Sequence, residues 1–216
     1  MNSLTPVTSL TESMIQLLQR RPVNAEEDDL KEDLQLGLST IHRRSRHLTR
    51  FVSNYRQFMS LPPPDKKWIE AAPFIQGIQQ LLQAELKGIT FTTSLEPAGL
   101  GLFADPVQLE QVMINLIKNS IEALAGQSHP QVKITVYAED EGCYLTVEDN
   151  GEGIERKNLN SIFVPFFSTK EKGSGIGLSL GRQIILAHRG TLSVTSETGK
   201  FTRFTIGLPG PVSSPA

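Results

Sequence analysis

The stretch that decides the fold is DNGEGI, residues 149–154, which directly follows a segment whose residues alternate as in a β-strand. A carboxylate at the end of a strand, such as that of Asp149, can accept a hydrogen bond from an exocyclic amino group like that of adenine. The glycines permit unusual torsions and let the backbone approach a flat base. Alone, the segment is also typical of a turn or, weakly, of a calcium loop that lacks its further oxygen ligands.

Two asparagines precede this stretch in a segment predicted to be helical from Pro106 to about Ala125, with Asp105 as its N-cap. Asn115 and Asn119 are four residues apart, so they lie on one face of that helix. Their amide oxygens could help hold a magnesium ion that phosphate has already neutralised, because Mg²⁺ uses few protein ligands. On its own, such a pair is usually just a polar helix face.

A glycine-rich stretch, GSGIGL at residues 173–178, opens a helix predicted over Gly177–His188. Free N–H groups and the helix dipole favour phosphate at such a position. It is not a Walker motif, because no Gly-Lys-Ser/Thr follows. Between the two glycine-rich stretches lie Phe163, Phe166 and Phe167, which fit either a core cluster or a hinged flap.

Together, in this order and spacing, the four segments resemble the N, G1, F and G2 boxes of histidine kinases. That family shares the Bergerat ATP-binding fold with gyrase, Hsp90 and MutL, and the resemblance extends from about residue 70 to residue 208. It implies ATP and Mg²⁺ as cofactors. It also implies a Bergerat-type α/β sandwich, which agrees with the alternation of helix and strand signals: an α+β fold with a mainly antiparallel mixed sheet under helices.

The resemblance implies roles for individual residues. Asp149 would bind the adenine amino group, and Asn119 would be the main Mg²⁺ ligand, with Asn115 near the phosphates. Residues 155–172 would form an ATP lid anchored by Phe166 and Phe167, with Lys170 along the phosphates. The other implied nucleotide contacts are Gly151, Gly153, Ile154, Gly173, Gly175, Ile176, Gly177 and Leu178. The family's last segment often reads Gly-x-Gly-Thr; here it is GKFT, residues 199–202, a difference not expected to affect nucleotide binding.

The N-terminal region predicts a helical hairpin, half of a four-helix bundle, over residues 1–61. Apolar residues follow a helical stripe over residues 2–20 and a near-heptad pattern from about residue 25 to 60. One hairpin has too little core to stand alone, so we expect a homodimer through residues 2–60. A proline-rich linker is predicted over 62–69, a catalytic ATP-binding domain over 70–208 and a disordered tail over 209–216.

The hairpin resembles the dimerisation and phosphotransfer domain of histidine kinases. In that family the phosphorylated histidine begins a box that continues as residues 2–6 of this chain do. We therefore expect the phosphoacceptor and its neighbouring acid to lie before Met1, and this chain to bind ATP without normal autophosphorylation. His42 and His47 lie among arginines, which indicates a solvated basic face more than a substitute acceptor. The implied partner is a response regulator receiver domain.

Composition sets further bounds. The chain has 216 residues, 38% of them hydrophobic, and a net charge of −2, which argues against nucleic-acid binding. Its single cysteine excludes an intrachain disulfide and fits a reducing compartment. No run reaches the roughly 20 apolar residues of a membrane span. We expect a cytoplasmic fragment without membrane contact, and the resemblance to histidine kinases implies a parent of a kind often anchored in the inner membrane.

Three alternatives remain open. Another ATPase of the gyrase, Hsp90 or MutL type would carry a water-activating glutamate where this chain has Asn115, and would lack the hairpin. A serine kinase of the anti-sigma type would also lack the hairpin. A dimeric scaffold could use ATP only as a structural ligand. The intact boxes argue against loss of nucleotide binding, and the expected lack of a phosphoacceptor would make this alternative true of the fragment but not of its parent.

Overall fold

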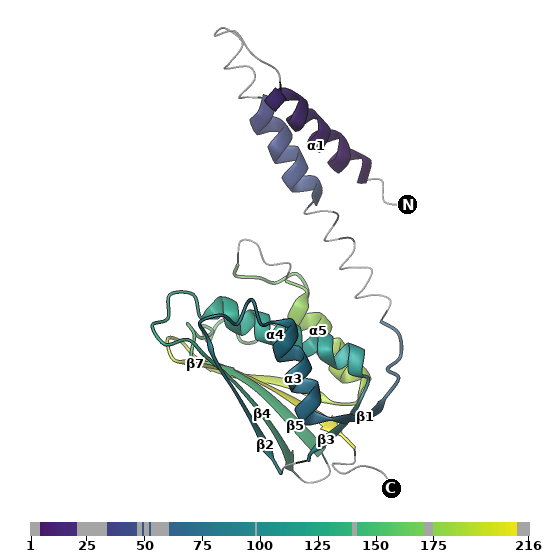
Figure 1. The fold of residues 1–216 in the computed structure, drawn as a ribbon, viewed down its shortest axis with the longest axis vertical. Helices are drawn as coiled ribbons and strands as arrows, with labels where there is room; N and C mark the ends of the chain where they lie inside the picture. The colour runs from purple at the N-terminus through teal and green to yellow at the C-terminus, as the bar shows by residue number, and fades with distance from the viewer. Residues whose placement is uncertain are drawn as a thin grey trace. The chain divides into compact units, whose positions relative to one another are not determined.

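The computed structural model describes residues 5–20, 34–46, 49, 52, 61–97, 99–139, 142–170 and 175–210. The chain divides into two compact units, residues 1–60 and 61–216 (Figure 1). The predicted link around Pro22, Gly173 and the last six residues of the predicted tail lie outside the described residues.

The first unit contains helix α1 (Thr5–Arg20) and a second helical segment over residues 34–46. Its buried polar residues include Thr11, whose hydroxyl lies 3.2 Å from Nδ1 of His42 and thereby joins the two helical segments. Several large apolar side chains of this unit are exposed instead: Val7, Leu10, Met14, Leu34, Leu36 and Ile41.

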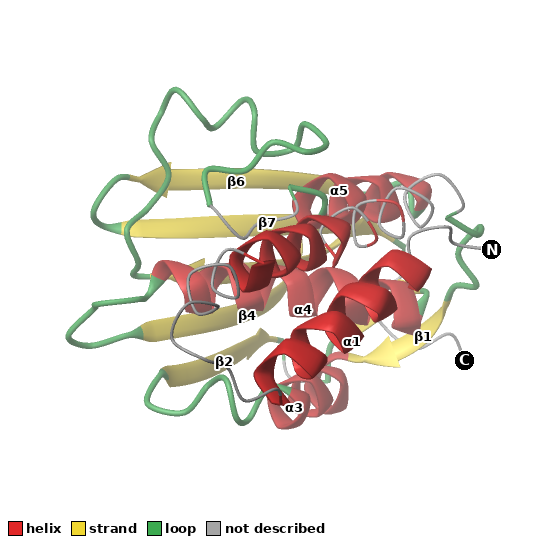
Figure 2. Cartoon of the chain, turned by 90° about the horizontal axis from the view of Figure 1, so that it is seen from above, coloured by secondary structure: helices red, strands yellow, loops and turns green. Residues whose placement is uncertain are grey.

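The second unit is built on a five-stranded sheet of order β2-β4-β5-β7-β6. Strands β2 and β4 are parallel and the other neighbours are antiparallel, so the prediction of a mainly antiparallel mixed sheet in an α+β fold is confirmed. Figure 2 shows the strands side by side. Their bounds are β2 Thr90–Glu96, β4 Gln131–Glu139, β5 Gly142–Asp149, β6 Thr191–Glu197 and β7 Phe201–Pro209.

Helices α3 (Ala71–Leu81), α4 (Pro106–Ala123) and α5 (Gly177–Ala187) cover one face of this sheet (Figure 1). Alternate residues of β4, beginning with Val132 and Ile134, are fully buried, as are Leu109 and Met113 of α4. The period of two in the strand and of three to four in the helix therefore directs both apolar faces into one core. This packing places α4 and α5 beside each other above the strand ends that carry the site.

Helix α4 begins where the sequence predicts, because Asp105 caps it. The Asp105 carboxylate accepts hydrogen bonds from the N–H groups of Val107 and Gln108, at 3.0 and 3.1 Å. The backbone N–H of Asp105 in turn donates to Nε2 of the buried His188 at 2.9 Å. This pairing joins the start of α4 to the end of α5.

The predicted linker over 62–69 is partly wrong, because strand β1 (Lys67–Glu70) occupies its end. Strand β1 pairs with β3 (Gly101–Ala104) in a separate two-stranded sheet. A Cβ atom on Gly101 would lie 2.0 Å from the Trp68 ring, so a side chain at this position would collide with the indole as it lies here. Strands of four residues carry little periodicity, which is why the pattern missed β1.

Other element boundaries also shift. Helix α3 starts at Ala71, directly after β1, and ends at Leu81. Strand β7 extends to Pro209, which pairs with Gly142, so the predicted tail begins one residue too early. Among the described residues, no helix combines the length and the apolar character needed to cross a membrane.

Candidate nucleotide-binding site

Asp149 is the centre of the candidate site. It is the last residue of β5 and is 2% exposed, and its Oδ1 accepts a hydrogen bond from the N–H of Gly151 at 3.0 Å. Burial raises the pKa of the Asp149 carboxyl above its ordinary value, while the neighbouring Ser120 hydroxyl and the Gly151 N–H act in the opposite direction. None of the ion pairs between described residues involves Asp149, so it is a buried acceptor suited to a neutral donor.

The glycines of residues 149–154 are required by close backbone packing. A Cβ atom on Gly151 would lie 2.5 Å from the carbonyl oxygen of Ala123 in α4. Gly153 has a φ of 71° and a Cβ there would lie 2.3 Å from the carbonyl oxygen of Glu197. The loop is thus wedged between the end of α4 and the end of β6, which brings its backbone beside Asp149.

Asn150 fixes the end of β5 to the start of β4. Its Oδ1 accepts from the N–H of Gln131, and its amide donates to the carbonyl oxygen of His129, both at 2.8 Å. This residue was part of the quoted stretch but received no role from sequence. It holds the strand end on which the Asp149 carboxyl depends.

A polar row that sequence reasoning missed crosses three strands next to Asp149. In the antiparallel ladders Asp149 pairs with Thr202, and Thr202 pairs with Ser196. Directly paired side chains lie on the same face of a sheet. Thr202 is buried and Ser196 half-buried. The only sequence signal for this row is one hydroxyl residue in each of two strands, Ser196 and Thr202. Hydroxyl residues are common in strands, so this signal is weak.

Asn115 and Asn119 both lie on α4, as predicted. The Nδ2 atom of Asn115 is buried and has no hydrogen-bond partner among the described residues. A Cβ atom on Gly177 would lie 2.1 Å from Oδ1 of Asn115, so the start of α5 packs directly against this amide. A pocket between α4 and α5 is lined by Gln111, Val112, Asn115, Gly177, Leu180, Gly181 and Ile184.

The start of α5 suits an anion. Ile176 is its N-cap, and within the described residues no side chain caps the helix there. The N–H groups at the start of a helix, together with the helix dipole, favour phosphate oxygens. Ile176 is buried and Leu178 half-buried, so the predicted contribution of this segment rests on its backbone.

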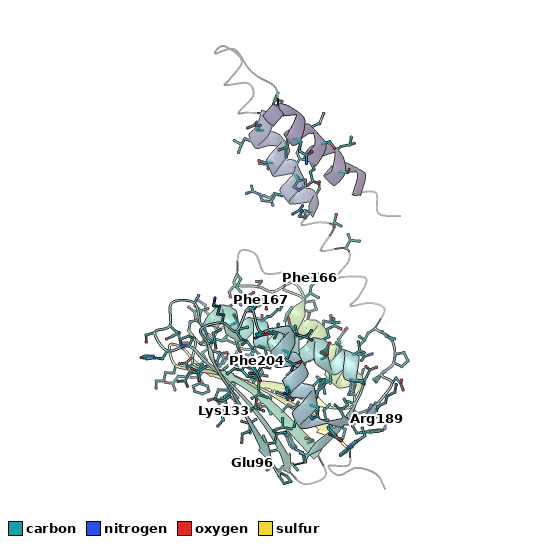
Figure 3. The ribbon with its side chains drawn as sticks, viewed as in Figure 1. Glu96, Lys133, Phe166, Phe167, Arg189 and Phe204 are labelled. Carbon is teal, nitrogen blue, oxygen red and sulfur yellow. The ribbon has the colours of Figure 1, made fainter. Side chains whose placement is uncertain are left out.

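Phe163 makes ring contacts to the rest of the unit, while anchoring of the segment by Phe166 and Phe167 stays a prediction. The Phe163 ring lies edge-on to Phe204 of β7 at 6.5 Å and 5.3 Å from the Arg182 guanidinium of α5. Phe166 is 44% exposed. Figure 3 labels Phe166, Phe167 and Phe204. Anchoring by Phe163 follows from packing across three elements, which no local pattern indicates.

Phe166 has a separate, backbone role. It has a φ of 69°, and its N–H donates to the carbonyl oxygen of Gly175 at 2.8 Å. A Cβ atom on Gly175 would lie 2.5 Å from the Phe166 carbonyl carbon. The two ends of the segment between these residues are therefore joined at its base.

Lys170 forms an ion pair with Glu122 of α4. Sequence reasoning placed Lys170 along the phosphates and gave Glu122 no role. Ile154, the last residue of the quoted stretch, is held by its backbone N–H, which donates to the Ser196 hydroxyl at 2.8 Å.

The residues present fit a magnesium–nucleotide complex. Within the described part of the chain, no group of three or more His, Cys, Asp or Glu residues could hold a metal ion. Asn115 and Asn119 offer neutral amide oxygens instead, which suits a cation whose other ligands are phosphate oxygens and water. The buried, unpartnered Nδ2 of Asn115 is a donor left for a further acceptor in this region.

Comparison with known proteins agrees with this geometry. Residues 104–212 match the family described as "Histidine kinase-, DNA gyrase B-, and HSP90-like ATPase". Sporulation kinase A of Bacillus subtilis is 40% identical over 146 residues, 67% of this chain and 24% of that protein. Sporulation kinase D of the same organism is 31% identical over 94% of this chain and 39% of that protein.

Solved structures give the same result. The catalytic domain of histidine kinase ThkA, in a nucleotide-free form, is 27% identical with a TM-score of 0.62 over 68% of this chain and 97% of that domain. Full-length ShkA with AMPPNP shares the fold, with a TM-score of 0.71 at 20% identity over 98% of this chain and 44% of that chain.

The chain belongs to the histidine kinase-, DNA gyrase B- and HSP90-like ATPase family. Within that family, its second unit is the ATP-binding domain of a sensor histidine kinase, as the resemblance of the four boxes implied. The chain spans about a quarter to two fifths of the length of the sporulation kinases it matches.

Proposed function

We propose that this chain is the catalytic core of a sensor histidine kinase that transfers the γ-phosphoryl group of Mg²⁺-ATP to a histidine. The observation that carries the proposal is Asp149, a buried carboxylate with no cationic partner among the described ion pairs. A buried acceptor without a counter-charge costs free energy unless a ligand donor meets it. The exocyclic amino group of adenine is such a donor, and the close packing of Gly151 and Gly153 brings the loop backbone beside Asp149.

The phosphates would lie between α4 and the start of α5. The N–H groups of the first turn of α5 would bind phosphate oxygens, while Asn119 and Asn115 would hold the magnesium ion. Mg²⁺ supplies charge neutralisation of the phosphoryl oxygens, and most catalysis in such transfers is positioning. An imidazole nitrogen forms the new N–P bond as the bond from the γ-phosphorus to the bridging oxygen breaks, and ADP leaves.

The phosphoryl acceptor is proposed to be a histidine, as the resemblance to histidine kinases implies. His188 is unsuitable, because it is 1% exposed and both its ring nitrogens are engaged, with Asp105 and Ile184. Relay would continue to a receiver domain of a response regulator. A structure of ThkA in complex with the response regulator TrrA shares the fold of this chain.

We also propose that the first unit forms a homodimer through residues 2–60. The apolar side chains of α1 and of the helix of residues 34–46 support this, since Leu10, Met14 and Leu36 are more than half exposed in a single copy. Sedimentation equilibrium should show self-association that Leu10→Gln with Met14→Gln abolishes. A monomer at all concentrations would contradict the proposed dimer and would leave the proposed nucleotide site unaffected.

Calorimetric titration with a non-hydrolysable ATP analogue, with and without Mg²⁺, tests the nucleotide site. We expect micromolar affinity for the native chain and loss of most of it in Asp149→Asn. Asparagine keeps the shape of the side chain, but its amide nitrogen is a donor where the carboxylate oxygen would accept from the adenine amino group. Glu148→Gln is the matched control, because Glu148 pairs with Arg203 on the neighbouring strand β7 and should leave affinity unchanged. Absence of any adenine-nucleotide binding in the native chain would refute the proposal.

Transfer itself needs an acceptor. Extending the chain upstream with a His-Glu pair should produce ATP-dependent, acid-labile phosphorylation, and replacing that histidine by glutamine should abolish it. Phosphorylation that persists in the glutamine variant would show that another residue accepts the phosphoryl group.

A further inference from the structure

The turn between β6 and β7 lies against the loop that follows Asp149. The N–H of Gly199 donates to the carbonyl oxygen of Glu152 at 2.7 Å. On the same side, Gly153 approaches Glu197 so closely that it cannot carry a side chain. The turn that departs from the family's usual Gly-x-Gly-Thr therefore contacts the proposed base pocket directly, although sequence reasoning gave it no influence there.

Ser196 is the central residue of this contact. Its hydroxyl accepts a hydrogen bond from the N–H of Ile154 at 2.8 Å and donates to the carbonyl oxygen of Phe201 at 2.7 Å. It also lies 3.1 Å from the hydroxyl of Thr202. One side chain thus bonds to the loop after Asp149, to its own hairpin and to the residue paired with Asp149.

These contacts determine the direction of one further hydrogen bond. A serine hydroxyl has one proton and two acceptor lone pairs. The Ser196 hydroxyl donates its one proton to the carbonyl oxygen of Phe201, so it can only accept in its contact with Thr202. The Thr202 hydroxyl is therefore the donor of that hydrogen bond. The proton of Thr202 is then committed to Ser196, and the Thr202 oxygen is left as an acceptor only. Asp149 and Thr202, side by side in the ladder, both offer acceptors.

We propose that Ser196 is a positioning residue of the nucleotide site, which holds the loop of residues 152–154 in place and orients the Thr202 hydroxyl as an acceptor beside Asp149. This inference rests on the proposed function. A pair of acceptors favours a base edge that carries an amino donor, as adenine does, over one that carries a carbonyl, as hypoxanthine does. Ser196 therefore acts on selection of the base and not on the phosphates.

Calorimetric titration of ATP, adenosine and inosine triphosphate into four chains tests this role: native, Ser196→Ala, Ser196→Thr and Ser193→Ala. Ser193 lies exposed on the same strand and is the matched control. Loss of a hydroxyl that satisfies a partly buried N–H should raise the Kd for ATP and for adenosine by the same factor, roughly five- to tenfold. The preference for ATP over inosine triphosphate should fall. Ser196→Thr keeps the hydroxyl and should restore binding to within about twofold.

A second measurement needs no nucleotide. Amide hydrogen exchange of residues 150–155 in the free protein should be faster in Ser196→Ala than in Ser193→Ala, because the Ile154 N–H loses its acceptor. Equal exchange in the two variants, or an unchanged Kd for ATP in Ser196→Ala, would overturn the role of Ser196. Native chain that binds no adenine nucleotide would instead refute the proposed function, and hydrogen exchange alone would then decide whether Ser196 holds the loop.

Discussion

The ammonium group of Lys170 is paired with the carboxylate of Glu122, although 48 residues separate them in the chain. Glu122 lies near the end of α4, the helix that carries Asn115 and Asn119. The resemblance to histidine kinases would place this lysine beside the ATP phosphates. If it binds phosphate there, it must first leave Glu122, so the carboxylate competes with the nucleotide for one cation.

Replacing Glu122 by glutamine should therefore strengthen ATP binding. Both partners are about half exposed, at 40% for Lys170 and 58% for Glu122. Such pairs contribute only about 0.2–1 kcal/mol, so we expect the Kd for ATP to fall by at most roughly fivefold. The gain should shrink in high salt. Titration calorimetry at low and high ionic strength measures it.

Two controls define that result. Adenosine has no phosphates, so its affinity should not change in Glu122→Gln. Glu85→Gln removes the partner of a different lysine, Lys118 of α4, and should leave ATP affinity unaltered. Weaker ATP binding in Glu122→Gln would show instead that Glu122 holds Lys170 in its productive position.

Two glycines of α5 should respond oppositely to alanine. A Cβ atom on Gly181 would meet its nearest neighbour, Val112, at an ordinary 3.6 Å. Gly181→Ala should raise the free energy of unfolding by about 0.5–1 kcal/mol through helix propensity and leave nucleotide binding unchanged. Gly177→Ala should displace the Asn115 amide, whose Oδ1 would lie 2.1 Å away, and weaken Mg²⁺-ATP binding roughly tenfold or more.

Urea unfolding and nucleotide titration of both variants separate these effects. The difference matters because both glycines lie in the same helix and both line the pocket between α4 and α5. Unchanged Mg²⁺-ATP affinity in Gly177→Ala would remove Asn115 from the nucleotide site.

Asp149 should lower stability at neutral pH while it supports binding. Burial raises its pKa, so the folded state binds this proton more tightly than the unfolded state does. The ionised carboxylate therefore costs stability above the folded pKa, and that cost disappears as the pH falls below the unfolded value. Asp149→Asn should be more stable than the native chain at pH 7, and the difference should narrow on acidification.

Thermal unfolding of both chains from pH 7 to pH 4 measures this difference. Acidification should have the opposite effect on nucleotide affinity, because protonation of Asp149 removes the acceptor and weakens binding. An Asp149→Asn variant that is less stable than the native chain at pH 7 would mean that a protein group already compensates the charge, and that no ligand donor is needed.

Asp105 should have the opposite pH dependence. Partial burial acts to raise its pKa, but the N–H groups of Gln108, Asp65 and Val107 outweigh it and hold the pKa below its ordinary value. Its contribution to stability is therefore present above the unfolded pKa and is lost as the pH falls through the folded one. Asp105→Ala should lower the free energy of unfolding by about 1 kcal/mol, the usual cost of losing an N-cap.

Asp105→Asn separates two roles of this carboxylate, which caps α4 and also accepts a hydrogen bond from the N–H of Asp65. Its amide oxygen can still cap α4, but its amide nitrogen cannot accept the N–H of Asp65, which now bonds to Oδ2 at 3.0 Å. We expect near-native stability with faster hydrogen exchange at Asp65. Exchange as slow as in the native chain would show that β1 and the Lys66 bond to His188 hold this segment without Asp105.

Sequence by itself indicated those candidate residues of the nucleotide site whose chemistry is local. Asp149, its glycines and the Asp105 cap are recognisable because a turn, a helix start or a close backbone approach limits the residue type over a few positions. The α+β class followed in the same way, from periods of two and of three to four residues. These features depend on neighbours in the chain, so a pattern in the chain can reveal them.

Only the tertiary structure decided the contacts that support the site. The row Asp149, Thr202 and Ser196 depends on the register of two ladders, and the Lys170–Glu122 pair joins residues 48 positions apart. The anchoring role of Phe163 depends on a strand and a helix that follow it. Side-chain type says little about such partners, because a serine, a lysine or a phenylalanine is acceptable in many places. The packing of α4, α5 and the sheet brings distant segments within a few ångströms, and this packing decides which serine, lysine or phenylalanine contacts the site.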